Sequence, residues 1–185
     1  YNLLNYTTSC SIHSETYSDS PALEHITKLN KSLLLLSKID NGQFTETVAL
    51  ELNELLKQYM DDYKEVYAYR DIQTEIVEDG IFCVQMNESL ATILITNLLK
   101  NAFVHNIDGG HIRIEITPHS FTFRNSGVGQ PLDEERIFER FYQGAKKEGS
   151  TGLGLAIVDS ICRLQNIGLR YYFENGEHCF EISEK

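Results

Sequence analysis

The chain has 185 residues, 42% of them hydrophobic and 10% aromatic, so it can bury a core and hold one full domain plus an attached helical piece. Its formal net charge of −11 argues against a general nucleic-acid or anionic-membrane surface, because phosphate backbones require clustered Lys and Arg. The longest aliphatic run, residues 33–36, is far shorter than the roughly 20 residues of a membrane-spanning helix.

A first helix is predicted over residues 22–40. Asp19 or Ser20 is a candidate N-cap, Pro21 suits the first helical position, and Gly42 supplies a stop. An ordinary amphipathic helix lying on its own domain is one interpretation, and a helical hairpin that pairs with a second copy is the other. The apolar residues follow alternating steps of four and three, which favours the hairpin. They are Ala22, Ile26, Leu29, Leu33 and Leu36.

The rest of the chain alternates between strand spacing and helical spacing. Asn87 is a candidate cap for a long helix, and Asn175-Gly176 is a strong hairpin signal. Residues 130–150 are polar and longer than a typical connection, which predicts a mobile lid. The fold class is α/β: a two-layer α/β sandwich in which a mixed sheet is covered by about three helices, preceded by a partial helical hairpin. Strands are predicted at residues 48–50, 72–78, 82–86, 111–117, 119–125, 169–174 and 178–182, and helices at 52–67, 90–102 and 151–166.

Two asparagines stand out inside the predicted helix over residues 90–102. Asparagine is roughly 0.6 kcal/mol worse than alanine as a helix former, so Asn97 and Asn101 need a reason to be there. They lie four apart and share one face, whereas Leu94 and Leu98 mark the core face. The two amides either merely tolerate solvent or cap a neighbour, or they belong to a site.

Glycines form two clusters, residues 125–129 at a strand end and residues 149–155 at a helix start. Backbone N–H groups without side chains can approach phosphate oxygens, and a helix N-terminus adds partial positive charge. A P-loop is excluded because Gly-Lys-Ser/Thr is absent, and Ile157 stands where a dinucleotide fingerprint needs a third glycine. The four cysteines form no C-x-x-C pair and the six histidines no metal-ligand spacing, which indicates reduced cysteines and argues against zinc. Each glycine cluster alone also fits a purely structural turn.

Four motifs in this order resemble the N, G1, F and G2 boxes of the sensor histidine protein kinases. The resemblance implies the Bergerat-type ATP-binding fold of the GHKL superfamily over residues 43–185, with the lid at about 130–150. Residues 1–42 would be the C-terminal part of the dimerisation and phosphoacceptor hairpin. The motifs are Asn97-x-x-x-Asn101-Ala102, Asn125-x-Gly127-x-Gly129, Ile137-Phe138-Glu139-Arg140-Phe141-Tyr142 and Gly149-x-x-Gly152-x-Gly154-Leu155.

The resemblance also implies a role for each matching residue. Asn101 would give its side-chain oxygen to Mg²⁺, while Asn97 and Arg140 would complete the catalytic set. Phe138, Phe141 and Tyr142 would pack the lid down. The residues that would bind ATP are Asn101, Asn125, Gly127, Gly129, Thr151, Gly152, Leu153, Gly154 and Leu155.

The implied reaction is transfer of the ATP γ-phosphoryl group to a histidine of the dimerisation domain, for relay to an aspartate of a response regulator receiver domain. A homodimer through the helical hairpin is expected, without nucleic acid, and with a membrane only through segments outside this chain. The expected location is cytoplasmic, as the cytoplasmic portion of a membrane-anchored sensor.

The sequence departs from the family pattern in three places. Neither His13 nor His25 has a His-Glu-x-x-Thr-Pro-like surrounding, so we expect the phosphoacceptor upstream of residue 1 and no self-labelling by this chain. Asn125 stands where the family usually has an aspartate that accepts a hydrogen bond from the adenine amino group. Val104 stands where it often has a cation, a contact that a nearby lysine could replace. The candidates are Lys100, Lys146 and Lys147.

Two other functions remain as alternatives. Chaperone-like and gyrase-like ATPases of the same fold carry a glutamate four residues before the metal-binding asparagine, whereas this chain has Asn97 there. An amide cannot take a proton from water at neutral pH, so hydrolysis is disfavoured as the main activity. The remaining alternative is a degenerate nucleotide-binding or dimerisation module without kinase activity.

Overall fold

The computed structural model describes residues 21–144 and 150–185, in which helices and strands alternate along the chain. A single-turn 3₁₀ helix, η1 (Ala68–Arg70), joins the second helix to the second strand. The other elements are α1 (Pro21–Asp40), β1 (Val48–Glu51), α2 (Leu52–Val66), β2 (Gln73–Glu78), β3 (Cys83–Met86), α3 (Glu88–Val104), β4 (His111–Ile116), β5 (Ser120–Ser126), α4 (Gly154–Leu164), β6 (Gly168–Glu174) and β7 (Glu177–Ser183).

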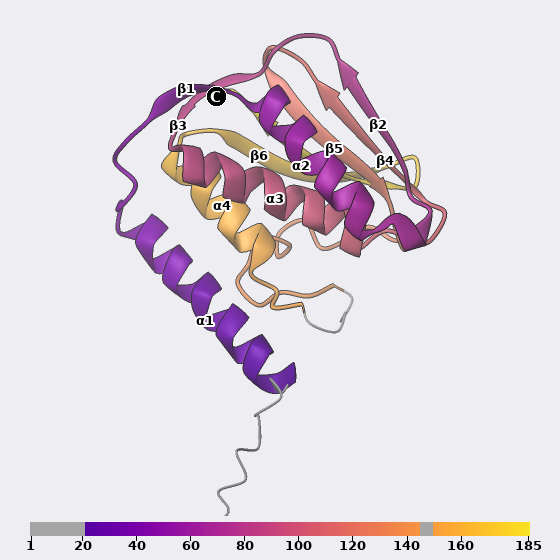
Figure 1. The fold of residues 1–185 in the computed structure, drawn as a ribbon, viewed down its shortest axis with the longest axis horizontal. Coiled ribbons are helices and arrows are strands. Elements are labelled where there is room, and N and C mark those ends of the chain that lie inside the picture. The colour runs from indigo at the N-terminus through magenta and orange to yellow at the C-terminus, as the bar shows by residue number, and fades with distance from the viewer. Residues whose placement is uncertain (1–20, 145–149) are drawn as a thin grey trace, which may run out of the picture.

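The main sheet has five strands in the order β2-β4-β5-β7-β6. Strands β2 and β4 are parallel, and the other neighbours are antiparallel. Helices α2, α3 and α4 lie side by side on one face of this sheet (Figure 1). These two layers confirm the predicted α/β sandwich with a mixed sheet.

Alternation of side chains builds the sheet. On β4 the inward residues Ile112, Ile114 and Ile116 are buried, and on β5 Phe121 and Phe123 face the same layer. The β6–β7 hairpin turns at Asn175-Gly176, where both residues have positive φ, as a two-residue turn of this type requires.

One pairing differs from what local spacing suggests. Residues 72–78 and 82–86 form strands as predicted, but β2 and β3 do not belong to the same sheet. Strand β3 pairs antiparallel with β1 in a separate two-stranded sheet, in which Val48 lies opposite Met86. The buried amide of Asn53 on α2 bridges this corner, because it accepts a hydrogen bond from Phe82 N and donates one to Gly80 O.

The core lies between the helices and the main sheet. Leu94, Leu98 and Ala102 of α3 are fully buried, as are Val158 and Ile161 of α4. As predicted, Asn87 caps α3, since its side-chain oxygen accepts hydrogen bonds from Ser89 N and Leu90 N. Helix α3 is therefore fixed at its N-terminus and along its apolar face.

Helix α1 packs on α4 at the edge of the helical layer (Figure 1). Leu36 and Ile39 are buried there, whereas Ile26 and Leu34 are more than half exposed. The pairing of α1 with a second copy stays a prediction. Within residues 21–144 and 150–185, no helix is both long enough and apolar enough to cross a membrane.

Candidate functional site

The two asparagines of α3 lie one helical turn apart, as predicted, and Asn97 is turned toward the start of α4. Asn97 Nδ2 donates a hydrogen bond of 2.7 Å to Ile93 O, one turn back. A Cβ atom built on Gly154 would lie 3.1 Å from Asn97 Oδ1, so the first residue of α4 sits against this amide oxygen. Asn101 is partly exposed one turn further, and its side chain forms no hydrogen bond with another described residue.

Asn125 lies near the end of β5 and is 1% exposed. Its Nδ2 donates a 2.9 Å hydrogen bond to Ser126 O, so its amide is held in one orientation. Its Oδ1 is the one buried side-chain polar atom of the described residues that has no hydrogen-bond partner. An unpaired buried acceptor costs about 1–3 kcal/mol, so this oxygen is ready to accept a hydrogen bond from a ligand.

The first glycine cluster follows Asn125 directly. Gly127 lies on the ring of His178, where an added Cβ would be 2.7 Å from Cδ2. Gly129 has open space around its Cα, and the Val128 side chain between them is 66% exposed. The loop after β5 is thus held close to the sheet at Gly127 and open at Gly129.

The second glycine cluster leads into α4. Gly152 has φ +67° and lies against the backbone of Phe141, and Phe141 N donates a hydrogen bond to Gly152 O. Helix α4 begins at Gly154 without a side-chain cap, and its first helical hydrogen bond runs from Ile157 N to Leu153 O. The backbone N–H groups of residues 154–156 therefore have no partner within the helix, which suits an anion.

Two of the predicted binding residues have apolar side chains that pack on the core. Leu153 is fully buried, and Leu155 packs against the same core. Thr151 is partly exposed. The side chains of Leu153 and Leu155 therefore position the start of α4.

Among the described lid residues, 130–144, Ile137 is the buried anchor, at 3% exposed; it begins the third motif, but no role was expected for it. Phe138 and Tyr142 are partly buried against the core, as expected, but Phe141 is 56% exposed and does not pack the lid down. Phe141 has φ +67°, and its backbone N–H is bonded to Gly152 O. Residues 145–149, and with them Lys146 and Lys147, lie outside the described residues.

Arg140 does not join the asparagines in this structure. Its Nη2 forms a 2.6 Å ion pair with Asp40 Oδ2 at the end of α1, and both side chains are about half exposed. The ion pair links the lid to α1, a contact between residues 100 apart in sequence.

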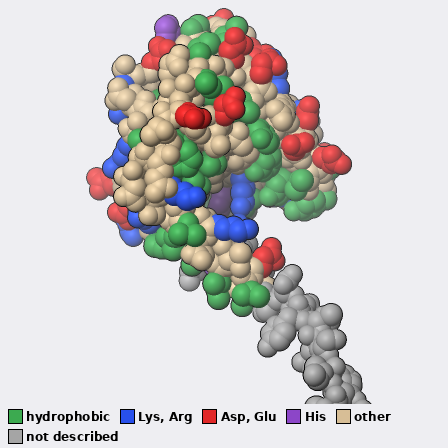
Figure 2. Space-filling view, turned by 60° about the vertical axis from the view of Figure 1, so that its left-hand side comes forward, with side chains coloured by type: hydrophobic (Ala, Val, Ile, Leu, Met, Phe, Trp, Pro, Cys, Tyr) green, Lys and Arg blue, Asp and Glu red, His purple; other side chains and the backbone are tan. Residues whose placement is uncertain are grey.

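Lysines of α1 and α3 lie close together, since Lys28 neighbours Lys100. Figure 2 shows Lys and Arg side chains around a hollow between the body of the domain and the helix that leads to the grey segment. Burial and, after it, the nearby charge of Lys28 on α1 lower the pKa of Lys100 to about 8, although Lys100 as a whole is exposed. The structure thus brings Lys28 to one of the lysines that the sequence offered in place of the cation missing at Val104.

The C-terminus of α3 is held by polar residues that the sequence did not flag. The guanidinium of Arg70 donates hydrogen bonds to Phe103 O and Asn106 O. The buried Asn106 Oδ1 accepts a 2.6 Å hydrogen bond from Ser126 Oγ, which ties α3 to the end of β5. These bonds fix the distance between the asparagine helix and the Asn125 loop.

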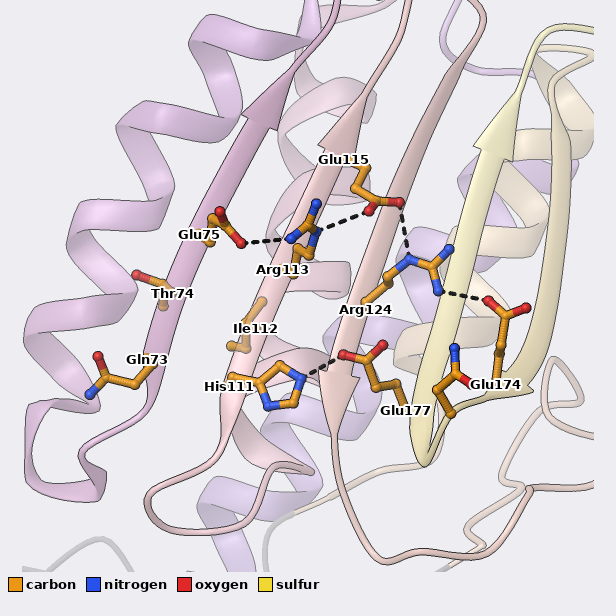
Figure 3. A pocket seen from close by; sticks show the side chains of 11 residues that line it. Gln73, Thr74, Glu75, His111, Ile112, Arg113, Glu115, Arg124, Glu174 and Glu177 are labelled. Atoms are coloured by element: carbon orange, nitrogen blue, oxygen red, sulfur yellow. Dashed lines mark hydrogen bonds and ion pairs between the residues drawn. The ribbon is translucent and has the colours of Figure 1, made fainter.

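Two hollows lie away from these residues. One is on the face of the main sheet that the helices leave uncovered, where charges alternate across the strands (Figure 3). The other lies between α2 and α3, lined by Leu55, Lys57 and Asp61 among others. Neither includes an asparagine or glycine of the four motifs. The ion pairs of the charged face are Glu75–Arg113, Arg113–Glu115, Glu115–Arg124 and Arg124–Glu174.

Comparison with known proteins connects this geometry to a family. Residues 86–182 match the sequence profile described as histidine kinase-, DNA gyrase B-, and HSP90-like ATPase. The heme sensor protein HssS of Staphylococcus saprophyticus is 32% identical over 76% of this chain and 32% of its own length. The sensor histidine kinase RppB of Synechocystis is 32% identical over 74% of this chain and 32% of its own. The chain thus spans about a third of these relatives.

Solved structures agree on the fold. The nucleotide-free catalytic domain of histidine kinase ThkA superposes with a TM-score of 0.65 at 23% identity, covering 75% of this chain and 94% of that domain. ThkA in complex with response regulator protein TrrA superposes with a TM-score of 0.62 at 21% identity, covering 93% of this chain and 52% of the other.

Proposed function

Because this chain belongs to the family of histidine kinase-, DNA gyrase B- and HSP90-like ATPases, we propose that it binds ATP with Mg²⁺ as the catalytic part of a sensor histidine kinase. Residues 43–185 would be the ATP-binding catalytic domain, and residues 1–42 the C-terminal part of the dimerisation hairpin. The nucleotide would lie between the asparagine face of α3 and the start of α4.

The observation that carries the proposal is the unpaired Oδ1 of Asn125. A buried acceptor fits the amino group of adenine, which is a hydrogen-bond donor at the edge of the base. Because Asn125 Nδ2 is committed to Ser126 O, rotating the amide would bring two oxygens together. The pocket therefore offers an acceptor to the base, and it should reject guanine, whose corresponding group is a carbonyl oxygen.

The phosphate end is supported by the second glycine cluster and by α3. Gly152 and Gly154 bring backbone N–H groups to the surface at the start of α4, where the helix dipole favours negative charge. A protein with a net charge of −11 needs such local help to bind a polyanion, and Lys28 and Lys100 add to it.

Asn101 is the proposed ligand of Mg²⁺, because its amide is partly exposed, forms no bond with other described residues and lies on the face shared with Asn97. One neutral oxygen suits an ion that takes few protein ligands when phosphates and waters complete its octahedron. When bound, Mg²⁺ would neutralise charge on the phosphates. The Oδ1 of Asn97 faces Gly154 and cannot act as a base toward water, which favours transfer over hydrolysis.

The proposed reaction is in-line transfer of the γ-phosphoryl group to a histidine nitrogen, which is itself a nucleophile. The residues of this chain would then bind, align and neutralise rather than form covalent bonds. Arg140 would exchange its Asp40 partner for the nucleotide. The acceptor histidine would belong to the dimerisation hairpin, and its phosphoryl group would pass to an aspartate of a response regulator. A protein of that class is found in complex with ThkA. His25 is exposed on α1 without the acceptor surrounding, and His13 lies outside the described residues.

Binding of ATP and GTP tests the proposal directly. Calorimetry in Mg²⁺ should show ATP bound at least about tenfold more tightly than GTP, since a carbonyl facing Asn125 Oδ1 leaves two acceptors unpaired. Equal affinity for both nucleotides would contradict the base assignment, and binding of neither would contradict the proposed function.

A further inference from the structure

A continuous chain of hydrogen bonds runs beneath the loop that follows β5. Leu132 N donates a 3.0 Å hydrogen bond to Tyr171 Oη on β6. Tyr171 Oη lies 2.9 Å from Nδ1 of His178 on β7, and His178 Nε2 lies 3.2 Å from Val128 O. Both rings are buried, with Tyr171 at 5% and His178 at 6% exposed.

The donor and acceptor of each hydrogen bond follow from the two groups at the ends of the series. Leu132 N–H can only donate and Val128 O can only accept. Tyr171 therefore accepts from Leu132 and gives its own proton to His178 Nδ1, which leaves the imidazole proton on Nε2 for Val128 O. Burial lowers the pKa of His178, and the bond to Val128 only partly offsets this, so the neutral ring is favoured. Every donor in the chain then has an acceptor.

The first part of the loop that these hydrogen bonds hold, residues 127–129, buries little apolar surface. Gly127 and Gly129 have no side chains and that of Val128 is 66% exposed, so burial of apolar surface does not order residues 127–129, whereas Leu132 packs against the core. Within the loop, Gln130 N donates a 2.6 Å hydrogen bond to Val128 O. The hydrogen bonds of His178 and Tyr171 instead hold Val128, in the first glycine cluster, and Leu132, near the start of the lid. His178 also fills the space over Gly127 and pairs with Asn125 across the β5–β7 ladder.

We propose that Tyr171 and His178 are positioning residues that hold residues 127–132 in the conformation that receives the base of the nucleotide. This inference rests on the proposed ATP site and adds to it two residues outside the four motifs. They act through the loop backbone and through Asn125, so their effect belongs to the adenosine part of the ligand. The triphosphate and its Mg²⁺ are bound by other residues.

The variant Tyr171→Phe removes only the hydroxyl group. The ring keeps its packing on Phe180, 5.1 Å away between centroids, while Leu132 N–H loses its acceptor and His178 Nδ1 its donor. The dissociation constants of ATP, ADP and adenosine should all rise by the same factor, about tenfold, because the loss lies in the part that the three ligands share. Tyr172→Phe is the matched control, since Tyr172 is the next residue of β6 and its hydroxyl accepts a bond from Arg124 on the other face.

Three results would overturn the inference. They are unchanged binding by Tyr171→Phe, a loss confined to ATP, and an equal loss in Tyr172→Phe. A spectroscopic measurement adds a readout that loss of packing alone would not give. The ¹⁵N shifts of His178 should show a proton on Nε2 and none on Nδ1 at neutral pH. The opposite tautomer would contradict the proposed role of Tyr171 and His178, which we call the clamp.

Failure of the clamp and failure of the proposed function are separable. If the wild-type chain binds none of the three ligands, the proposed ATP site is contradicted. Hydrogen exchange of the Leu132 amide then tests separately whether Tyr171 and His178 hold the loop. The Leu132 amide should be protected in the wild-type chain and exchange about tenfold faster in Tyr171→Phe, as expected when a buried acceptor is removed. Equal exchange rates would contradict the clamp.

Discussion

Replacing Gly152 by alanine tests the close approach between the lid and the start of α4. Gly152 has φ +67°, a conformation that costs an L-residue about 1–2 kcal/mol. The new Cβ would also lie 2.8 Å from Phe141 C and 2.9 Å from Phe141 Cα. These are backbone atoms, so the clash cannot be relieved by turning a side chain, and overpacking of this kind adds about 1–3 kcal/mol.

Gly42→Ala separates the two contributions. Gly42 has φ +62° and nothing within 4 Å of an added Cβ, so this variant carries the conformational cost without the clash. Thermal unfolding should place Gly42→Ala roughly 2–8 °C and Gly152→Ala roughly 4–20 °C below the wild-type chain, at about 2–4 °C per kcal/mol for this size. Gly152→Ala should in addition weaken ATP binding, because the backbone of the lid at Phe141 would have to shift away from residue 152. Equal melting temperatures for the two variants, with unchanged ATP affinity, would refute the close approach.

Three further predictions concern the residues around the site. Arg70→Met should lower the free energy of unfolding by about 2–3 kcal/mol in urea titrations, since it leaves carbonyls at the end of α3 without donors; a loss below about 0.5 kcal/mol would contradict this capping. Asp40→Asn should raise ATP affinity up to about fivefold, the equivalent of one exposed ion pair, because it releases Arg140; weaker binding would indicate that the ion pair supports the site. Burial raises the pKa of Glu115, but its bonds to Arg124 and Arg113 outweigh this and hold it below the ordinary value, so its stabilisation should disappear as pH falls through that lowered pKa. Glu115→Gln should reduce the pH dependence of the free energy of unfolding between about pH 5 and pH 2, roughly the range where carboxylates titrate. An unchanged pH dependence would contradict this role.

Local pattern was enough for much of the fold. The cap at Asn87, the apolar face of α3 and the turn at Asn175-Gly176 follow from neighbours along the chain, and the structure has all three. Pairing of strands over long separations does not follow from such patterns. Residues 72–78 and 82–86 have the right spacing, yet nothing local states that β2 joins β4 and that β3 joins β1.

Residues of the candidate site could be proposed from the sequence where a motif names them, but contacts that cross the fold could not. Asn97 was found because asparagine is unusual inside a helix, and Asn125 because it begins the first glycine motif of the resemblance. The ion pair of Arg140 with Asp40 bridges 100 residues, and neither partner signals the other. His178 did carry a signal, because it shares the inward face of β7 with Phe180, and a polar residue at a core position must find partners.

Calorimetric titration of ATP into the wild-type chain and Asn101→Ala, each with and without Mg²⁺, tests the central claim most directly. The wild-type chain should bind ATP more tightly when Mg²⁺ is present, and Asn101→Ala should lose most of that gain, about tenfold in affinity, because the proposed metal ligand is removed. Adenosine should bind both chains equally, since it carries no phosphate. Absence of ATP binding by the wild-type chain, or an undiminished effect of Mg²⁺ in Asn101→Ala, would contradict an Mg·ATP site between α3 and α4.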